Sequence, residues 1–529
     1  MSEFDFVIVG SGINSLVCAA MLALDDLRVC VVERNDRLGG CIRTDEVTLP
    51  GFQHEVMASF YPLFVSSPAF KALEAELEAE GVRFRPSARP TAVAMPDGRA
   101  FVMSSKLESV IADLDTLAPG DGQRYARALS EASAMHGVLG NVLDNEPRGL
   151  QALFAAWNGI RHMGINGLVE HAGRLSESAR DWLETTFESD VARALFAPWV
   201  LHMGLDPDAS GSGGMLRLQA SLMQNTGLPC VEGGGIRLIE AFVRIVARRG
   251  GIFMKNAEVE RVGIEHGAAR GVTLTDGTVL RAKRAVVCNV TPTQLYDRLL
   301  PAGQIPERVK SDAKRFRYGL SDMQIHLALR APVDWVDPAL NDVAMVHVTA
   351  GIDAIARASN EARRRLLPAE PTIVVAQHAA LDPSRVPVGH SLLWIQLQEL
   401  PARPSGDAAG EIETSPDSQW TPAIREAYAD RVINRLATLM PELKQHILMR
   451  TVFSPRDLEA INVNLVGGDP YSGACSIAQS LAWRPFPSSR GHATPFKRLY
   501  HIGASTHPGP GVGGMSGFMV ARHLLGRRH

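Results

Sequence analysis

Two glycines near the start of the chain, Gly10 and Gly12, have the spacing of a loop that binds a phosphate group. They follow an apolar run at residues 4–9 and precede an apolar, alanine-rich segment at residues 16–24. A sharp turn between a strand and a helix leaves backbone N–H groups at the helix N-terminus, where they and the helix dipole bind a pyrophosphate. The pattern therefore predicts a dinucleotide site. The alternative is an ordinary glycine-rich turn.

Glu33 closes the same unit and indicates which nucleotide is bound. It ends a second apolar strand at residues 28–33, about 20 residues after the turn, as a dinucleotide fingerprint requires. A carboxylate in this place accepts hydrogen bonds from ribose hydroxyls and would repel a 2′-phosphate. We therefore expect an unphosphorylated adenosine, as in FAD or NAD. Ser15 stands where a third glycine is usual and is small enough for helix packing.

The residues after Glu33 resemble the large FAD superfamily that contains the amine oxidases and the phytoene desaturases. Gly39, Gly40, Arg43 and Thr44 match a second glycine pair, with a following Arg and Thr, that lies along the pyrophosphate and flavin in this family. Cys41 stands where amine oxidases usually have Arg, which favours the desaturase branch. The resemblance implies that FAD is the cofactor.

Residues 499–517 carry the most specific part of this resemblance. A strand leads into a Gly-x-x-Thr-His-Pro-Gly run that starts at Gly503 and is characteristic of the carotenoid-desaturase-like branch. The resemblance implies that Gly503 faces the pyrophosphate. It also implies that a helix beginning near Gly513 presents N–H groups to the flavin, where its positive end stabilises the charge that develops on reduction. Among the members, the chain looks most similar to a phytoene-dehydrogenase-related group that includes a pyridine nucleotide-disulfide oxidoreductase domain-containing protein.

The same resemblance assigns two further segments to the cofactor site. Residues 50–59 pass close to the flavin ring in the family, and the backbone of Val259 would hold the adenine edge. The predicted cofactor-binding residues are Gly10, Gly12, Ile13, Asn14, Ser15, Glu33, Arg34, Gly39, Gly40, Arg43, Thr44, Met57, Ala58, Ser59, Val259, Gly503, Ala504, Gly513, Gly514 and Met515.

Length and composition narrow the class of protein. The chain has 529 residues, 46% of them hydrophobic and 21% charged, so two or three globular domains are expected. A net charge of −3 argues against a nucleic-acid partner. The six cysteines form no CxxC pair and no other metal-ligand spacing, which argues against the disulfide-reductase branch of flavoproteins, and no metal site is predicted. No apolar run approaches the ~20 residues of a membrane span. We expect a cytoplasmic protein, with peripheral membrane contact left open.

We predict an α/β fold: a Rossmann-type FAD-binding domain with a second substrate domain of mixed sheet and helices, as in amine oxidases and phytoene desaturases. The FAD-binding domain would comprise residues 1–66, 227–300 and 495–529, and the substrate domain residues 67–226 and 301–494. The patterns favour helices at 68–81, 237–249 and 421–439, hairpins at 91–103 and 272–280, strands at 285–290, 321–329 and 392–400, and a surface loop at 401–418.

The resemblance implies an oxidoreductase that takes a hydride from an apolar, isoprenoid or alicyclic, substrate and leaves a C=C double bond. Segments 150–169 and 195–223 are rich in Trp, Met, Leu and Phe, and would line an apolar pocket, touch a membrane or form a helical core. The residue that accepts the proton is not identified. Candidates by residue type alone are His54, Glu55, His202 and His507, and His54 could also link the flavin covalently or be an ordinary loop residue.

Other functions stay open at this stage. A flavin amine oxidase and a polyene isomerase or saturase use the same scaffold. A prenyl-binding protein similar to the Rab GDP-dissociation inhibitors would share the fold without FAD. The electron acceptor would be oxygen, a quinone or a protein, and a dimer is conceivable. Arg484 would meet the flavin or an acidic substrate, or form a structural ion pair.

Overall fold

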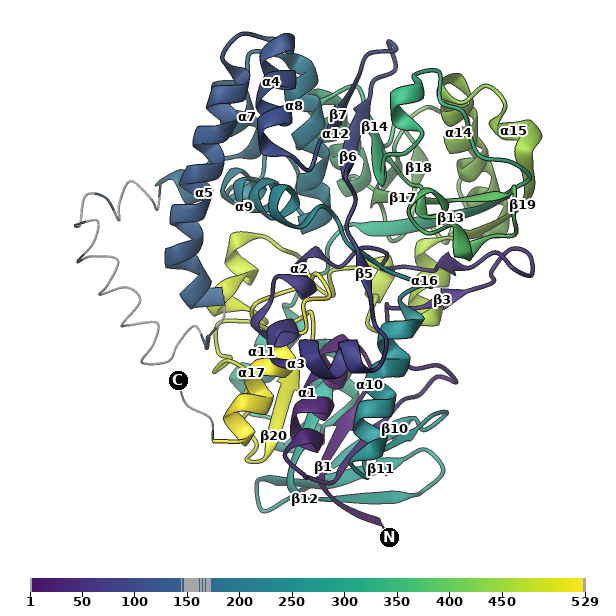
Figure 1. Ribbon diagram of the computed structural model, residues 1–529. Helices are drawn as coiled ribbons and strands as arrows, with labels where there is room; N and C mark the ends of the chain where they lie inside the picture. Colours follow the sequence, from purple (N-terminus) through teal and green to yellow (C-terminus); the bar gives the residue numbers. More distant parts are fainter. Residues whose placement is uncertain are drawn as a thin grey trace.

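The computed structural model describes residues 2–143, 145–146 and 173–526, together with the single positions 161, 164 and 167. Figure 1 shows two layered parts, each built around one seven-stranded sheet. The part that contains the N-terminal strand also contains the last helix, so both ends of the chain return to the same sheet. Among the described residues, no helix is long and apolar enough to cross a membrane.

The first sheet has the parallel centre expected of a dinucleotide-binding unit. Its strands are β1 (Ser2–Val9), β2 (Val29–Val32), β9 (Ile252–Met254), β10 (Val259–Glu265), β11 (Ala268–Leu274), β12 (Val279–Asn289) and β20 (Leu499–Ile502). They lie in the order β10-β11-β12-β1-β2-β9, and β20 pairs with the end of β12. β1 is parallel to both β2 and β12, so three carboxyl ends meet at one edge. That edge is where ligands bind in open α/β sheets.

The second sheet is mostly antiparallel and provides the upper part of Figure 1. Its order is β19 (Ile447–Phe453), β13 (Ser321–Leu329), β17 (Ser391–Leu400), β16 (Ile373–Ala376), β14 (Met345–Val348), β6 (Thr91–Ala94) and β7 (Ala100–Met103). The central strands β13 and β17 are almost entirely buried. An apolar cluster joins one side of this sheet to α14 (Pro422–Leu439).

Another apolar cluster joins this sheet to a group of helices. The helices are α4 (Leu107–Leu117), α5 (Asp121–Leu143), α7 (Ala179–Thr186), α8 (Asp190–Phe196), α9 (Ser212–Thr226) and α12 (Ile352–Arg363). The predicted apolar stretch 195–223 belongs largely to this helical core. The other stretch, 150–169, falls outside the described residues apart from positions 161, 164 and 167.

Further elements complete the two parts. They are the helices α2 (Pro62–Val65), α3 (Pro68–Ala79), α11 (Glu307–Lys314), α13 (His378–Leu381), α15 (Leu443–His446) and α16 (Pro455–Ile461), and the strand pairs β3 (Thr44–Asp45) with β4 (His54–Glu55), β5 (Phe84–Arg85) with β8 (Cys230–Val231), and β15 (Leu366–Leu367) with β18 (Gly406–Asp407). The segment predicted as a surface loop, 401–418, is mostly exposed or half-buried, but it includes β18, whose pairing was not foreseen. The domain bounds themselves stay a prediction.

Candidate functional site

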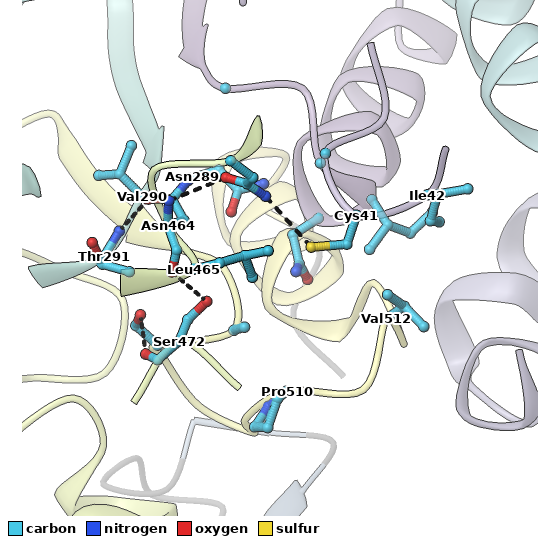
Figure 2. Close-up of a pocket in the computed structure, with 18 of the residues that line it drawn as sticks. Cys41, Ile42, Asn289, Val290, Thr291, Asn464, Leu465, Ser472, Pro510 and Val512 are labelled. Carbon is cyan, nitrogen blue, oxygen red and sulfur yellow. Dashed lines mark hydrogen bonds between the residues drawn. The ribbon is translucent and has the colours of Figure 1, made fainter. Parts of the chain in front are cut away.

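A cavity of about 510 Å³ lies between the two sheets, at the carboxyl ends of β1, β2 and β12. Segments far apart in the sequence surround it. In Figure 2 they are represented by Cys41, Ile42, Asn289, Val290, Thr291, Asn464, Leu465, Ser472, Pro510 and Val512. The volume is in the range of small-molecule and cofactor sites. The place in the fold is the one at which open α/β sheets bind ligands.

Glycines form a cradle along one wall of this cavity. Gly10 has a φ of +84°, and a Cβ there would lie 2.9 Å from the backbone oxygen of Asn289. A Cβ on Gly40 would lie 3.2 Å from the Cα of Gly12, and Gly12 itself forms a β-bridge with Gly39. Because side chains are absent here, a ligand can approach the backbone closely. The residues present therefore fit a pyrophosphate.

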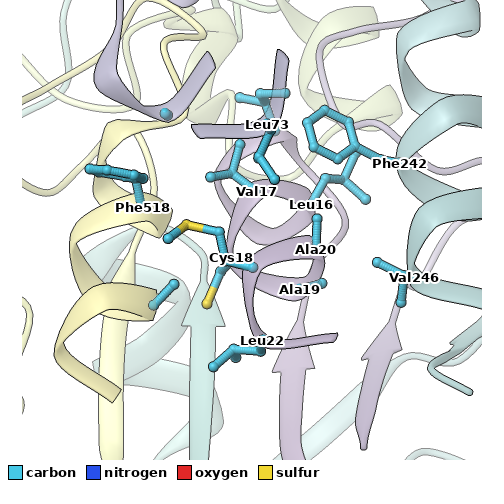
Figure 3. Close-up of a cluster of buried hydrophobic side chains, with 14 of the residues drawn as sticks. Leu16, Val17, Cys18, Ala19, Ala20, Leu22, Leu73, Phe242, Val246 and Phe518 are labelled. Atoms are coloured by element: carbon cyan, nitrogen blue, oxygen red, sulfur yellow. The ribbon is translucent and has the colours of Figure 1, made fainter. Parts of the chain in front are cut away.

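The helix behind this cradle is α1 (Ile13–Leu24), which no side chain caps at its N-terminus. Its first N–H groups are therefore available to an anion. Figure 3 shows how the helix is held: Leu16 and Val17 pack near Leu73, Phe242 and Phe518, which come from three other helices. Two of those helices are α10 (Ile236–Arg248) and α17 (Met515–Leu524), and the third is α3. The turn is thus fixed by a buried core before any ligand binds.

Glu33 lies at the end of the cavity next to Arg34 and Val259. One carboxylate oxygen accepts hydrogen bonds from the backbone N–H and the hydroxyl of Ser11, at 3.0 and 2.7 Å. The other accepts from the backbone N–H of Asn35 at 3.0 Å. A carboxylate has about four acceptor positions. The side chain is therefore oriented by the protein and can still accept a hydrogen bond from a ligand hydroxyl.

The cavity brings together most of the residues predicted from the sequence. Those that line it are Gly10, Gly12, Ile13, Asn14, Glu33, Arg34, Gly39, Gly40, Met57, Ala58, Val259, Ala504, Gly513, Gly514 and Met515. Those that do not are Ser15, Arg43, Thr44, Ser59 and Gly503. Ser15 instead accepts a hydrogen bond from Asn289 at 2.9 Å, and the N–H of Gly503 donates to Ser516 at 2.9 Å. The roles of all these residues as cofactor ligands stay our proposal.

Thr44 belongs to a buried polar junction below the cavity. Its hydroxyl donates to Glu55 at 2.9 Å and accepts from the backbone N–H of Ile236 at 3.0 Å. Glu55 forms an ion pair with Arg385 at 2.9 Å, and Arg385 also contacts Asp382 at 3.3 Å. Both Glu55 and Arg385 are fully buried. This junction links β4 and the turn before α10 to the second part of the chain.

None of the four proton acceptors considered from the sequence lines the cavity. Glu55 already pairs with Arg385 and accepts a hydrogen bond from Thr44 in the buried junction. His54 is buried, bonds Thr48 at 2.8 Å, and has its pKa lowered to about 3 by burial and by the charge of Arg385. His202 bonds His347 at 2.9 Å, and burial lowers its pKa to about 3 as well. His507 is buried. As proton acceptors, these four residues stay candidates by residue type alone.

Arg484 is also absent from the lining of the cavity. It is buried, and its guanidinium donates to backbone carbonyls, among them those of Ala504 at 2.9 Å and Tyr471 at 2.9 Å. The side chain therefore fastens the segment around residue 471 to the loop that follows β20. Among the described residues it contacts carbonyl groups and forms no ion pair.

Sequence reasoning missed the polar side chains that the second sheet contributes. Asp322 and Gln324 on β13, Gln396 on β17 and the nearby Tyr471 all line the cavity. Asp322 and Gln324 are two residues apart and so share one face of the strand. The available signal was a polar residue at alternate positions of an otherwise apolar strand. Which face it would occupy could not be read from the sequence.

Comparisons with known proteins agree with this geometry. Residues 8–77 match the model of the NAD(P)-binding Rossmann-like domain. Pyridine nucleotide-disulfide oxidoreductase domain-containing protein 2 of Mus musculus is 26% identical over 99% of this chain and 94% of its own length. One of the subunits of limonene dehydrogenase from Castellaniella defragrans is 26% identical, with the same coverage. The neurosporene-forming phytoene desaturase of Cereibacter sphaeroides is 24% identical over 97% of this chain and 92% of its length.

The chain is a homologue of the phytoene desaturases. Its fold is also that of the amine oxidases: putrescine oxidase bound to putrescine superposes with a TM-score of 0.63 at 14% identity, over 99% of each chain. These findings confirm the predicted α/β fold and the resemblance drawn from the sequence. With that resemblance, they support an oxidoreductase that uses FAD and is related to the phytoene desaturases.

Proposed function

We propose that this chain is a FAD-dependent dehydrogenase that introduces a C=C double bond into an apolar, isoprenoid or alicyclic, substrate by hydride transfer to the flavin N5. The observation that carries the proposal is the lining of the cavity. Away from the nucleotide end it is formed largely by apolar residues: Ile42, Met57, Leu63, Met215, Leu458, Val463, Leu465, Pro510, Val512 and Met515. Two homologues named for apolar substrates, limonene and phytoene, support the same class.

The described residues suit an extended FAD molecule. The glycine cradle and α1 would hold the pyrophosphate, Glu33 the ribose and Val259 the adenine edge. Gly513, Gly514 and Met515 would lie against the flavin ring, at the N-terminus of α17. That helix end is positive and would stabilise negative charge on the ring. FAD supplies the hydride acceptor when bound, and the chain supplies its orientation and a dry cavity.

Anaerobic absorbance spectroscopy of the purified, FAD-loaded protein tests this function. We expect the flavin bands to bleach on addition of a terpene such as limonene, or of phytoene. These molecules have adjacent C–H bonds, so that one can release a hydride and the other a proton. Bleaching by amines alone would contradict the proposal and favour an amine oxidase. Absence of flavin bands after incubation with FAD would favour a prenyl-binding protein. The electron acceptor (oxygen, a quinone or a protein), a cytoplasmic location, membrane contact and a dimer stay predictions.

Substitution of Glu33 tests the nucleotide end of the site. We expect Glu33→Gln to weaken FAD binding by about 10- to 100-fold, because a hydrogen bond to a charged acceptor contributes about 1.5–3 kcal/mol. Flavin fluorescence during titration of the apoprotein with FAD measures the affinity. Glu260→Gln is the matched control, since Glu260 is exposed on β10 and does not line the cavity. Equal affinities of the two variants would remove Glu33 from the site.

A further inference from the structure

The two central strands of the second sheet present different chemistry on their two faces. Met323, Ile325 and Leu327 of β13 belong to the apolar cluster that includes α14. The alternate positions, Asp322 and Gln324, line the cavity together with Gln396 of β17. Gln324 and Gln396 are paired directly across the two strands. A central strand therefore carries a polar stripe that faces the cavity, and buried polar groups cost stability unless they are hydrogen-bonded.

Asp322 is the acidic member of this stripe. Only 2% of its surface is exposed. One carboxylate oxygen accepts a hydrogen bond from the side-chain amide of Gln396, and the other has no partner. The side-chain oxygen of Gln324 has no partner either. Among the described residues, Asp322 forms no ion pair. The structure therefore holds an oriented carboxyl group with one unsatisfied oxygen at the wall of the cavity.

The surroundings of Asp322 make it a stronger base than an ordinary aspartate. Burial raises its pKa well above 3.8, and the charge of Asp469 raises it further, while the Gln396 hydrogen bond lowers it. Cys41 and Tyr471, whose own pKa values are raised chiefly by burial, feel the charge of Asp322. None of these neighbours is a cation that would hold the carboxylate ionised. A buried acceptor left without a partner costs about 1–3 kcal/mol and therefore needs an explanation, of which a catalytic role is one.

We propose that Asp322 is the proton acceptor of the dehydrogenation, with Gln396 as the positioning residue that orients its carboxylate. The inference rests on the proposed function and deepens it. One C–H bond of the substrate breaks with its electron pair, which leaves as a hydride for the FAD. The adjacent C–H bond gives its proton to the free oxygen of Asp322, and its electrons form the C=C double bond. The proton later returns to solvent. The electrons pass on to the electron acceptor, which is oxygen, a quinone or a protein.

The first measurement is independent of the substrate. Infrared spectra of the FAD-loaded protein are recorded from about pH 4 to about pH 9, and the spectra of Asp322→Asn are subtracted from those of the wild type. We expect a carbonyl band of a protonated carboxylic acid that persists above about pH 5 and disappears at higher pH. If no such band remains at about pH 5, Asp322 stays ionised as a weak base, and the proposal is overturned whatever the substrate is.

The second measurement is the rate of flavin bleaching after anaerobic mixing with limonene or phytoene. We expect Asp322→Asn to slow bleaching by about 100- to 10,000-fold, with an unchanged affinity for FAD, because a positioned base contributes a factor of this size. Asp322→Glu should recover part of the rate. The wild-type rate should rise with pH and level off above the pKa found in the infrared experiment, whereas the residual rate of Asp322→Asn should lack this dependence.

Glu399→Gln is the matched control for the bleaching rate. Glu399 is a fully buried acid on β17, the strand next to Asp322, but it does not line the cavity. Its variant should bleach at the wild-type rate. A wild-type rate in Asp322→Asn, or a loss explained by lost FAD binding, would overturn the proposal. If no probe bleaches the wild type, the proposed substrate class fails, and the infrared result alone decides whether Asp322 exchanges a proton.

Discussion

Replacing Arg385 with leucine should lower the free energy of unfolding by about 3–5 kcal/mol, because it leaves buried carboxylates without their cation. Arg385 is fully buried, as is its partner Glu55 at 2.9 Å. Its guanidinium also contacts Asp382 at 3.3 Å and donates to the carbonyl of Val231 at 2.7 Å. One substitution therefore removes three partners at the point where the two parts of the chain meet. Urea denaturation, followed by circular dichroism, measures the change.

Arg315→Leu is the matched control for this prediction. Arg315 pairs with Asp312 at 2.6 Å, but 72% of its side chain is exposed. An exposed ion pair contributes about 0–1 kcal/mol, so the same substitution should have little effect there. If Arg385→Leu also costs less than about 1 kcal/mol, then the junction does not stabilise the fold in the way that its geometry indicates.

Glu399 should make the protein less stable as the pH rises from about 5 to about 9. Its carboxylate accepts hydrogen bonds from Ser359 at 3.1 Å and from the backbone N–H of Thr372 at 2.9 Å, yet burial raises its pKa from 4.5 to about 7. The folded state therefore binds this proton more tightly than the unfolded state. The resulting stability is fully present below pH 4.5 and is lost as the pH rises through about 7. At about 1.4 kcal/mol per pKa unit, the loss is about 3 kcal/mol.

Comparison with Glu399→Gln isolates this contribution from those of other buried acids. Between about pH 5 and about pH 9, the difference in unfolding free energy should move by about 3 kcal/mol in favour of the glutamine variant, which cannot ionise. Glu413→Gln serves as the control, since Glu413 is exposed in the segment that contains β18. A difference that does not change with pH would mean that Glu399 ionises normally in the folded protein.

The sequence determined the first strand, the glycine turn and the helix behind it because the information there is local. A strand, a glycine turn, a helix and a second strand follow one another within the first 33 residues, and each is specified by its own pattern. Position 10 requires glycine because its φ is positive. Glu33 directly follows β2. The C-terminal glycine loop is local too: its Gly513 and Gly514 line the cavity, and their contact with a flavin stays a prediction. Short-range chemistry of this kind can be read without a fold.

The tertiary structure alone decided the remaining chemistry. Asp322 and Gln396 are far apart in sequence and meet only because β13 and β17 pair and place one face toward the cavity. Arg385 and Glu55 are separated by 330 residues, so no local pattern could reveal their ion pair. Thr44, which the sequence assigned to the cofactor, is held in that junction. Residue type shows what a side chain can do. Burial and long-range pairing determine which group remains free to act, because they set its neighbours and its pKa.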